Sequence, residues 1–197
     1  MEKIEIKGIN YRLNEETLTA EVIEQENGYE GDIIIPETVV FQEVAYRVTS
    51  IGDLAFRFCE SLTSIIIPDG VTSIGENAFE DCSSLTSIVI PNGVTSIGQQ
   101  AFEGCKSISS IVIPDGVKSI GEFAFQYCSS LTSIVIPAKV KSIETQAFLG
   151  CSSLTSITFN GTKAQWQGIK LGKDWNARCP KITVHCTDGE VEIRMLL

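Results

Sequence analysis

The sequence predicts an α/β fold: a leucine-rich-repeat type of solenoid with a parallel β-sheet on one side, short helical or 3₁₀ segments and turns on the other side, and a small β-rich cap at each end. Two observations predict it. A unit of 23 residues recurs through most of the 197-residue chain, as the step from Leu62 to Leu85 illustrates. Within each unit, apolar residues first alternate with polar ones, which is the period of a strand that faces a core on one side. Units of this length stack into arrays, and each unit buries its apolar side against its neighbours.

Equivalent positions in successive units carry side chains of nearly constant size. Neighbouring parallel strands lie about 4.8 Å apart, so we expect each side chain in such a column to touch its copies above and below. The columns are Leu62, Leu85, Ile108, Leu131 and Leu154; Ile65, Ile88, Ile111, Ile134 and Ile157; Ile67, Ile90, Ile113, Ile136 and Phe159; Val71, Val94, Val117 and Val140; Ile51, Ile74, Ile97, Ile120 and Ile143; Ala55, Ala78, Ala101, Ala124 and Ala147; Phe56, Phe79, Phe102, Phe125 and Phe148; and Cys59, Cys82, Cys105, Cys128 and Cys151.

The elements of one unit can be predicted in order from its residues. Residues 62–67 alternate in polarity and form the strand. Pro68 ends the strand because it has no N–H to donate to a ladder, and the Asp-Gly pair after it makes a turn. Further on, Ala78 and Cys82 are four residues apart, so they share one face of a predicted helical segment of about two turns at most.

These columns resemble the BspA-like leucine-rich repeats of bacterial surface proteins. The matching motifs are Ile67-Pro68 after the strand, then Val71-Thr72-Ser73-Ile74-Gly75, then Ala78-Phe79 with Cys82, and they recur over roughly residues 33–160. The resemblance implies a curved, right-handed solenoid with the parallel sheet on its concave side, and a role in attachment or recognition at a bacterial surface. It supplies no catalytic motif and no cofactor, so we expect a protein that is not an enzyme.

Both ends of the chain depart from the repeat. We predict an N-terminal β cap at residues 1–32, the repeats at 33–160 and a C-terminal cap at 161–197. The first repeat is a variant with an insertion at residues 37–48, whose alternating residues predict a small hairpin. Caps are expected because each open end of a stacked array would leave its core exposed to water.

The net charge of −10 is unevenly placed along the chain. Residues 1–60 hold 13 acids and 5 bases (net −8), residues 61–160 hold 8 and 4 (net −4), and residues 161–197 hold 4 and 6 (net +2). An acidic surface repels phosphate backbones, so we expect no nucleic-acid partner. No apolar run reaches the roughly 20 residues of a membrane helix, so we expect no membrane insertion. We expect the chain to be a monomer.

The first residues, MEKIEIKGINYRL, alternate in polarity and lack the apolar block of a secretory signal. We therefore expect a location at the cell surface or outside the cell if a leader has been removed, with the cytoplasm as the alternative.

The chain has seven cysteines, which could bind a metal ion, form disulfides or act as nucleophiles. The five in the cysteine column lie in a line, which cannot converge on a metal ion, so we predict buried thiols that serve as small core residues. Cys179 and Cys186 lie outside the columns, and they could form a disulfide if the protein is exported. His185 adjoins Cys186, but neighbours along a strand point to opposite faces, so we expect neither a nucleophile pair nor a metal site there.

Trp166 and Trp175 lie in the C-terminal segment. They could stack on sugars or on a partner, but aromatic residues in a short cap more often fill its small core. We therefore favour a structural role for both.

The outward positions of the predicted sheet are the candidate partner-binding surface. An exposed aliphatic file on a sheet is an apolar patch, and such patches often mark contact sites. We therefore predict a recognition or adhesion module that binds a protein or glycan through this concave face or through the caps. The alternative is a structural scaffold, or a fragment of a larger surface protein, without a ligand of its own. The candidate residues are Ser64, Ser87, Ser110, Ser133 and Ser156 in one file, and Ile66, Val89, Val112, Val135 and Thr158 in the other.

Overall fold

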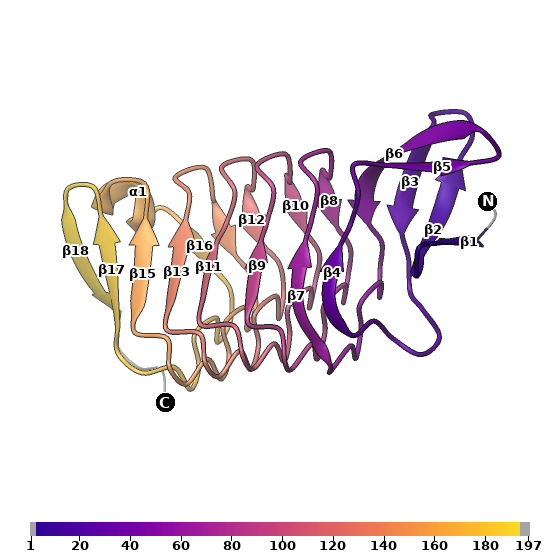
Figure 1. Cartoon of the computed structure of the whole chain (residues 1–197). Helices are drawn as coiled ribbons and strands as arrows, with labels where there is room; N and C mark the ends of the chain where they lie inside the picture. The colour runs from indigo at the N-terminus through magenta and orange to yellow at the C-terminus, as the bar shows by residue number, and fades with distance from the viewer. Residues whose placement is uncertain (1–2, 194–197) are drawn as a thin grey trace.

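The computed structural model describes residues 3–193 and confirms the predicted solenoid. Strand pairing is interrupted once on each side of the array, between residues 87–89 and 110–112 on one side and between residues 96–97 and 119–120 on the other. Parallel strands nevertheless form two layers on opposite sides of the array, and each turn of the chain gives one strand to each layer (Figure 1). We call them the front sheet and the back sheet. The chain leaves each front strand, crosses to the back sheet through the Pro-containing turn, and returns through a run of turns along the lower edge of Figure 1.

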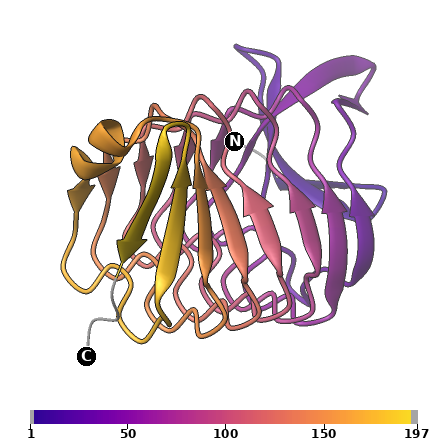
Figure 2. The same cartoon turned by 90° about the vertical axis from the view of Figure 1, so that its left-hand side faces the viewer.

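The front sheet holds the strands that the alternating pattern predicts. Strands β4, β7 and β9 pair in parallel, as do β11, β13, β15 and β17, and β18 closes the sheet antiparallel to β17. Figure 2, viewed from the C-terminal end, shows the last two strands in front of the array. The bounds are β4 (Gly31–Ile34), β7 (Leu62–Ile66), β9 (Ser87–Val89), β11 (Ser110–Val112), β13 (Ser133–Ile136), β15 (Ser156–Phe159), β17 (Ile182–Cys186) and β18 (Gly189–Ile193).

The back sheet is formed by the Ser-Ile pairs of the V-T-S-I-G motif, which the repeat pattern places in the core without indicating a strand. Ser73 and Ile74 pair in register with Ser96 and Ile97, and Ser119 and Ile120 pair in the same way with Ser142 and Ile143. The bounds are β6 (Val44–Ile51), β8 (Ser73–Ile74), β10 (Ser96–Ile97), β12 (Ser119–Ile120), β14 (Ser142–Ile143) and β16 (Lys170–Leu171).

Antiparallel strands close the N-terminal end. Strands β1 (Lys3–Ile6), β2 (Ile9–Asn14) and β3 (Thr19–Val22) form a meander, and β3 joins the back sheet through β6. The inserted residues form the expected hairpin, because β5 (Thr38–Phe41) pairs antiparallel with the first half of β6. The domain boundaries themselves stay a prediction.

The core consists of the predicted columns, which are buried along the whole array. The phenylalanine column is the clearest case. Neighbouring rings from Phe56 to Phe148 stack with centroids 5.0–5.4 Å apart and interplanar angles of 2–6°. Tyr29 packs on the first ring at 4.7 Å, and Trp175 meets the last one edge-on at 6.1 Å. The column therefore ends against a different aromatic residue on each side.

The A-F-x-x-C segments are runs of turns, and the prediction of a short helix there is wrong. Backbone bonds such as Cys82 N to Phe79 O span three residues. Asn77 and Asp81, on either side of the Ala-Phe pair, have φ angles of +54°, which a right-handed helix excludes. The turns are tied between units instead, because Phe56 N donates to Ala78 O at 2.8 Å and Phe79 N to Ala101 O. Within residues 3–193 the one helix is α1 (Lys163–Gln167), in the C-terminal cap.

Cys179 belongs to the cysteine column, which corrects its placement outside the columns. Phe148 N donates to Trp175 O, the same bond that Phe125 N makes to Ala147 O. Trp175 thus takes the alanine position, Asn176 the phenylalanine position and Cys179 the cysteine position. The C-terminal cap therefore begins as one more, strongly altered unit. Because its side chains differ from those of the columns, an alignment of units by their constant residues does not identify it.

Candidate functional site

Every front strand turns alternate side chains outward, and parallel pairing in register lines these side chains up in files. Ser110 pairs with Ser133 and Val112 with Val135, while Ile134 between them points into the core. The ten candidate residues all lie on this outward side, where they form one serine file and one mostly aliphatic file. That they bind a partner stays a prediction.

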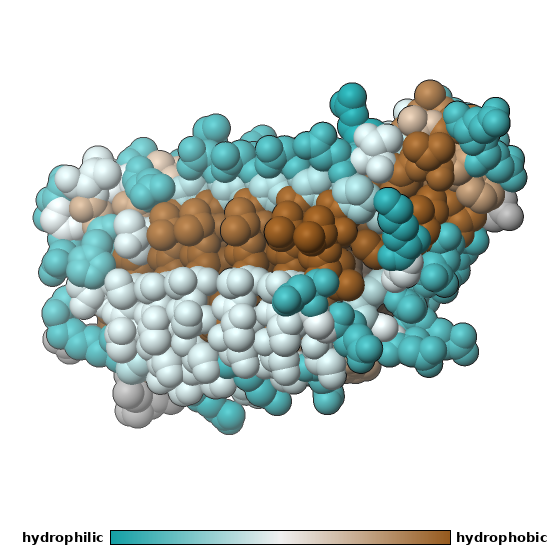
Figure 3. Space-filling model, viewed as in Figure 1, coloured by the Kyte–Doolittle hydropathy of each residue, from teal (hydrophilic) through white to brown (hydrophobic). Residues whose placement is uncertain are grey.

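The aliphatic file is an exposed apolar band across the front sheet. We call Ile34, Ile66, Val89, Val112 and Val135 the aliphatic stripe. The first four are 69%, 58%, 77% and 61% exposed, and Val135 is half-buried. Figure 3 shows apolar side chains in a band along the repeats, with a second apolar area on the N-terminal cap. The stripe ends in Thr158 and His185, which continue the register with polar side chains.

Ile34 extends the stripe by one strand, and it is a surface residue that the sequence-based prediction missed. It pairs with Ile66 in register. The signal was present, because Ile33-Ile34-Ile35 before Pro36 copies the Ile65-Ile66-Ile67 run before Pro68.

Hydroxyl groups flank the stripe on one side. The serine file is exposed or half-buried, and an exposed Thr/Ser file lies beside it. Some of these hydroxyls bond within the sheet, for example Thr86 Oγ1 to Thr63 O at 3.2 Å and Thr132 Oγ1 to Ser109 O at 3.0 Å. At the N-terminal end, Asp32 accepts from Ser64 and Thr63, and these bonds lower the pKa of its carboxyl. The face thus combines an apolar band with many neutral hydroxyls and one anchored carboxylate.

The stripe leads into an apolar pocket of about 360 Å³ between the first repeat and the N-terminal cap. Ile34 forms part of its wall, so the pocket and the stripe are continuous. Pockets with mostly apolar walls are the usual binding places for a buried anchor side chain. The pocket is lined by Ile6, Lys7, Ile9, Tyr11, Ile34, Pro36, Thr38, Val39 and Val40.

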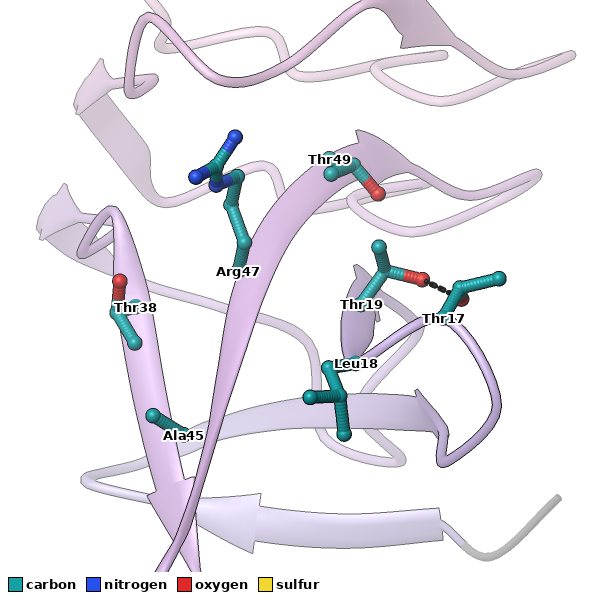
Figure 4. A pocket seen from close by; sticks show the side chains of 7 residues that line it. All are labelled: Thr17, Leu18, Thr19, Thr38, Ala45, Arg47 and Thr49. Carbon is teal, nitrogen blue, oxygen red and sulfur yellow. Dashed lines mark hydrogen bonds between the residues drawn. The ribbon is translucent and has the colours of Figure 1, made fainter.

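A second hollow, of about 500 Å³, lies between the N-terminal cap and the β5–β6 hairpin; it is lined mostly by polar residues and is less suited to an apolar anchor (Figure 4). Thr17 and Thr19 bond to each other through their hydroxyls at 2.8 Å. Arg47 points away from Thr17 and Leu18 in the close-up. The side chains therefore do not converge on one point. Its lining residues are Thr17, Leu18, Thr19, Thr38, Ala45, Arg47 and Thr49.

The thiols of the cysteine column donate hydrogen bonds within the core. Cys82 Sγ donates to Phe56 O at 3.0 Å, and the same bond recurs in each later unit up to Cys179 Sγ to Phe148 O. Burial raises the pKa of Cys82, so this thiol stays protonated at neutral pH.

The residues around His185 do not form a reactive centre. Cys179 and Cys186 are both free thiols, and Cys179 lies buried against the repeat. His185 Nδ1 lies 3.0 Å from Glu190 Oε1 across the β17–β18 pair, and the ring is exposed. Among residues 3–193, no three His, Cys, Asp or Glu side chains are grouped to hold a metal ion.

Both tryptophans fill the C-terminal cap, as the structural interpretation predicts. Trp166 and Trp175 are 3% and 4% exposed. They meet at 6.3 Å between ring centroids, and Trp166 also packs edge-on against Phe159 at 5.4 Å. Neither ring is available to a sugar. In the described part of the chain, no helix is long and apolar enough to cross a membrane.

Comparison with solved structures places the fold among bacterial leucine-rich-repeat proteins. A leucine rich cell surface protein from Faecalibacterium prausnitzii is 28% identical over 95% of this chain, with a TM-score of 0.69. The leucine-rich-repeat protein of T. pallidum is 24% identical over 90% of this chain and 89% of its own, also with a TM-score of 0.69. The pneumococcal vaccine antigen PcpA is 20% identical over 95% of this chain, with a TM-score of 0.72.

The chain spans 55% of the F. prausnitzii protein and 50% of PcpA. No curated protein sequence is significantly similar to it. The sequence profile of the BspA type leucine rich repeat region matches residues 49–169 in six copies, which is more than half of the chain. The repeat motifs, the stacked parallel strands and this match together show that the chain belongs to the BspA-type leucine-rich-repeat family.

Proposed function

We propose that the chain is a non-enzymatic recognition or adhesion module of a bacterial cell surface, and that it binds a protein partner through the front sheet. The observation that carries this proposal is the aliphatic stripe and its continuity with the apolar pocket at the N-terminal cap. A monomeric protein rarely leaves a contiguous apolar surface of this kind without a partner. The surface location is supported by the likeness to the F. prausnitzii protein, which is a leucine rich cell surface protein.

Burial of the aliphatic stripe alone does not supply enough free energy for a stable complex, so polar contacts must add to it. Full burial of one Val or Ile side chain stabilises a complex by about 1.5–3 kcal/mol, so four of them contribute roughly 6–12 kcal/mol. Association costs about 4–15 kcal/mol in lost freedom of motion, which is the same range. Additional contacts are therefore required, and the serine file and the pocket lie where they could supply them.

The front sheet is also suited to binding because pairing holds its strands on both sides of the interruption between β9 and β11. Its strands lie in register from β11 to β17, and the core columns behind them are buried. A surface that does not need to be ordered on binding loses less entropy when a partner arrives.

The test is a pair of acidic substitutions on the stripe. Val89→Asp with Val112→Asp places two carboxylates on the apolar band. The control is Ser96→Asp with Ser119→Asp, which adds the same charge at exposed positions of the back sheet. Binding of both proteins to a panel of immobilised host matrix proteins is measured by surface plasmon resonance. We expect the stripe variant to lose about tenfold or more in affinity, and the control to stay within about twofold.

One observation favours the alternative of a scaffold without its own ligand. The serine and aliphatic files change little from unit to unit, whereas binding surfaces usually concentrate their energy in a few distinctive side chains. Equal binding by the stripe variant and the control, or no binding of the unaltered protein to the whole panel, would support the scaffold and overturn the proposed role.

A further inference from the structure

We call the stacked turns that carry the A-F-x-x-C segments the turn layer. One position of this layer holds a different kind of side chain from unit to unit, unlike the constant files of the front sheet. It is the second variable position of A-F-x-x-C, occupied in successive units by Phe58, Asp81, Gly104, Tyr127 and Gly150. All five have left-handed backbone, with φ between 54° and 73°. Glycine adopts this conformation without strain, whereas an aspartate or a tyrosine there has a steric cost. The side chains of this file are therefore present in spite of the local backbone.

The two glycines make room for the side chains before them. A Cβ on Gly104 would overlap Oδ1 of Asp81, and a Cβ on Gly150 would lie 2.6 Å from Cδ1 of Tyr127. Asp81 thus leans over Gly104, and Tyr127 leans over Gly150. Both side chains lean toward the C-terminal end of the array. The ring of Tyr127 is therefore displaced away from Gly104, and a gap remains between Asp81 and the ring.

This gap is a hollow of about 410 Å³ in the turn layer. Gly104 lies between Asp81 and Tyr127 in the file. The ring of Tyr127 forms one wall of the hollow, and this residue is 41% exposed. The lining residues are Asp81, Glu103, Gly104, Lys106, Tyr127, Ser129 and Gly150.

The polar groups around the ring include both hydrogen-bond donors and acceptors, and one of them is held in place. Glu103 accepts from Gln100 Nε2 at 2.6 Å and from Gln126 Nε2 at 3.0 Å, which fixes its carboxylate at the hollow. Asp81 adds a second acceptor, and Lys106 and Ser129 add donors. The hollow therefore offers one aromatic face, two carboxylates, one ammonium group and one hydroxyl.

We propose that this hollow binds a neutral pyranose sugar, up to the size of a disaccharide. The C–H face of a pyranose packs on the Tyr127 ring, its hydroxyls donate to Asp81 and Glu103, and Lys106 and Ser129 donate to its oxygens. Hydroxyl donation to a carboxylate is a charge-assisted bond and is roughly twice as strong as a neutral one.

Other ligand classes fit the same groups less well. Two carboxylates against one ammonium group repel an anionic ligand. A purely apolar side chain would cover the carboxylates without satisfying them, which costs free energy. A neutral sugar uses all the groups that are present. This site is separate from the front sheet, so it goes beyond the function proposed above.

The experiment is saturation-transfer NMR on the full chain with lactose, maltose, cellobiose and diacetylchitobiose. We expect transfer to at least one of the four, with a dissociation constant of about 1 mM, as suits a shallow site with few contacts. Tyr127→Gly removes the ring at a position whose backbone suits glycine, so the protein stays folded, and we expect binding to fall by about tenfold or more. Tyr127→Phe keeps the ring and should bind within about threefold of the unaltered protein.

A matched control is available in the same file. Phe58→Gly removes an exposed aromatic ring from an identical backbone position outside the hollow, and binding should not change. The front-sheet variant with Val89→Asp and Val112→Asp should also keep its sugar affinity, which separates this proposal from the proposed function. No transfer to any of the four sugars at about 10 mM, or equal transfer in Tyr127→Gly, overturns the proposal.

Discussion

Two buried tyrosines in the N-terminal cap differ in how their hydroxyls are satisfied. Tyr29 Oη accepts from Asn10 N at 3.0 Å and donates to Ile23 O at 2.8 Å. Tyr11 is fully buried, and its hydroxyl has no hydrogen-bond partner within residues 3–193. A buried polar group without a partner costs free energy, whereas a satisfied one stabilises the fold.

Tyr11→Phe should therefore raise the free energy of unfolding by about 1 kcal/mol, because it removes an unsatisfied hydroxyl and keeps the ring. Tyr29→Phe should lower it by about 1–3 kcal/mol, because the Asn10 amide and the Ile23 carbonyl lose their partner. Urea unfolding of the two variants measures both values. Equal destabilisation by the two changes would contradict the assignment.

The same residues give the stability a pH dependence at high pH. Burial raises the pKa of Tyr11 and of Tyr29 from 10.0 to about 12. Above pH 10 the unfolded chain releases these protons while the folded chain retains them. The free energy of unfolding should then fall between pH 10 and pH 12, and it should fall less steeply in either phenylalanine variant.

At the scale of the element, the bend after each back strand depends on how closely two units approach. A Cβ on Gly98 would lie 2.5 Å from the backbone carbon and oxygen of Gly75. At Gly121, one unit further on, the nearest atom to such a Cβ is Gly98 O at 3.2 Å. The space available for a Cβ at this glycine position is therefore smaller at Gly98 than at Gly121.

Gly98→Ala should lower the free energy of unfolding by about 2 kcal/mol or more, because a rigid backbone blocks the added methyl group. Gly121→Ala should cost less than about 1 kcal/mol, because a shift of a few tenths of an ångström makes room for it. Thermal or urea unfolding of both variants tests the difference. A larger loss at Gly121 than at Gly98 would show that the close approach does not limit the bend.

The repeated elements were predictable because constant columns require stacked copies. The front strands, the buried files and the outward position of the ten candidate residues all follow from alternation and the fixed period. The turns were mistaken for helix because Ala78 and Cys82 have helical spacing. Gly104 and Gly150 in one column were the available sign of left-handed backbone.

The candidate binding surfaces were predictable only in part. The stripe follows from alternation, whereas the pocket beside Ile34 forms where the cap meets the first repeat, a contact that no periodic pattern encodes. The turn-layer hollow depends on the direction in which Asp81 and Tyr127 lean. The sequence shows that this file is irregular, but not toward which neighbour its side chains point.

At the scale of the whole molecule, the cysteine file runs the length of the array and reports on its integrity. Burial raises the pKa of Cys59, Cys82, Cys105 and Cys128, and for Cys151 and Cys179 the neighbouring thiol of the file is the first cause of the raised pKa. Cys186 lies outside the file and is half-buried, and burial raises the pKa of its thiol as well.

Titration with a disulfide reagent at about pH 8 should therefore detect one fast thiol, Cys186, in the native protein, because a reagent can reach this half-buried side chain whereas the other six thiols are buried. The other six should react only when the array opens, and all seven should react in denaturant. Replacing Cys186 with Ser provides the control, and it should abolish the fast phase. Fast reaction of several file cysteines in the native protein would contradict the stacked core.

The stacking of like side chains in the core columns has a consequence for how the gene can change. Unequal recombination that adds or removes one complete unit keeps like side chains stacked on like in every column, so the product can still fold. Such an event would lengthen or shorten the aliphatic stripe by one rung. If it removed the unit carrying Tyr127, the hollow would disappear while the interior stayed filled. The length of the array and the presence of the hollow can thus change independently of each other.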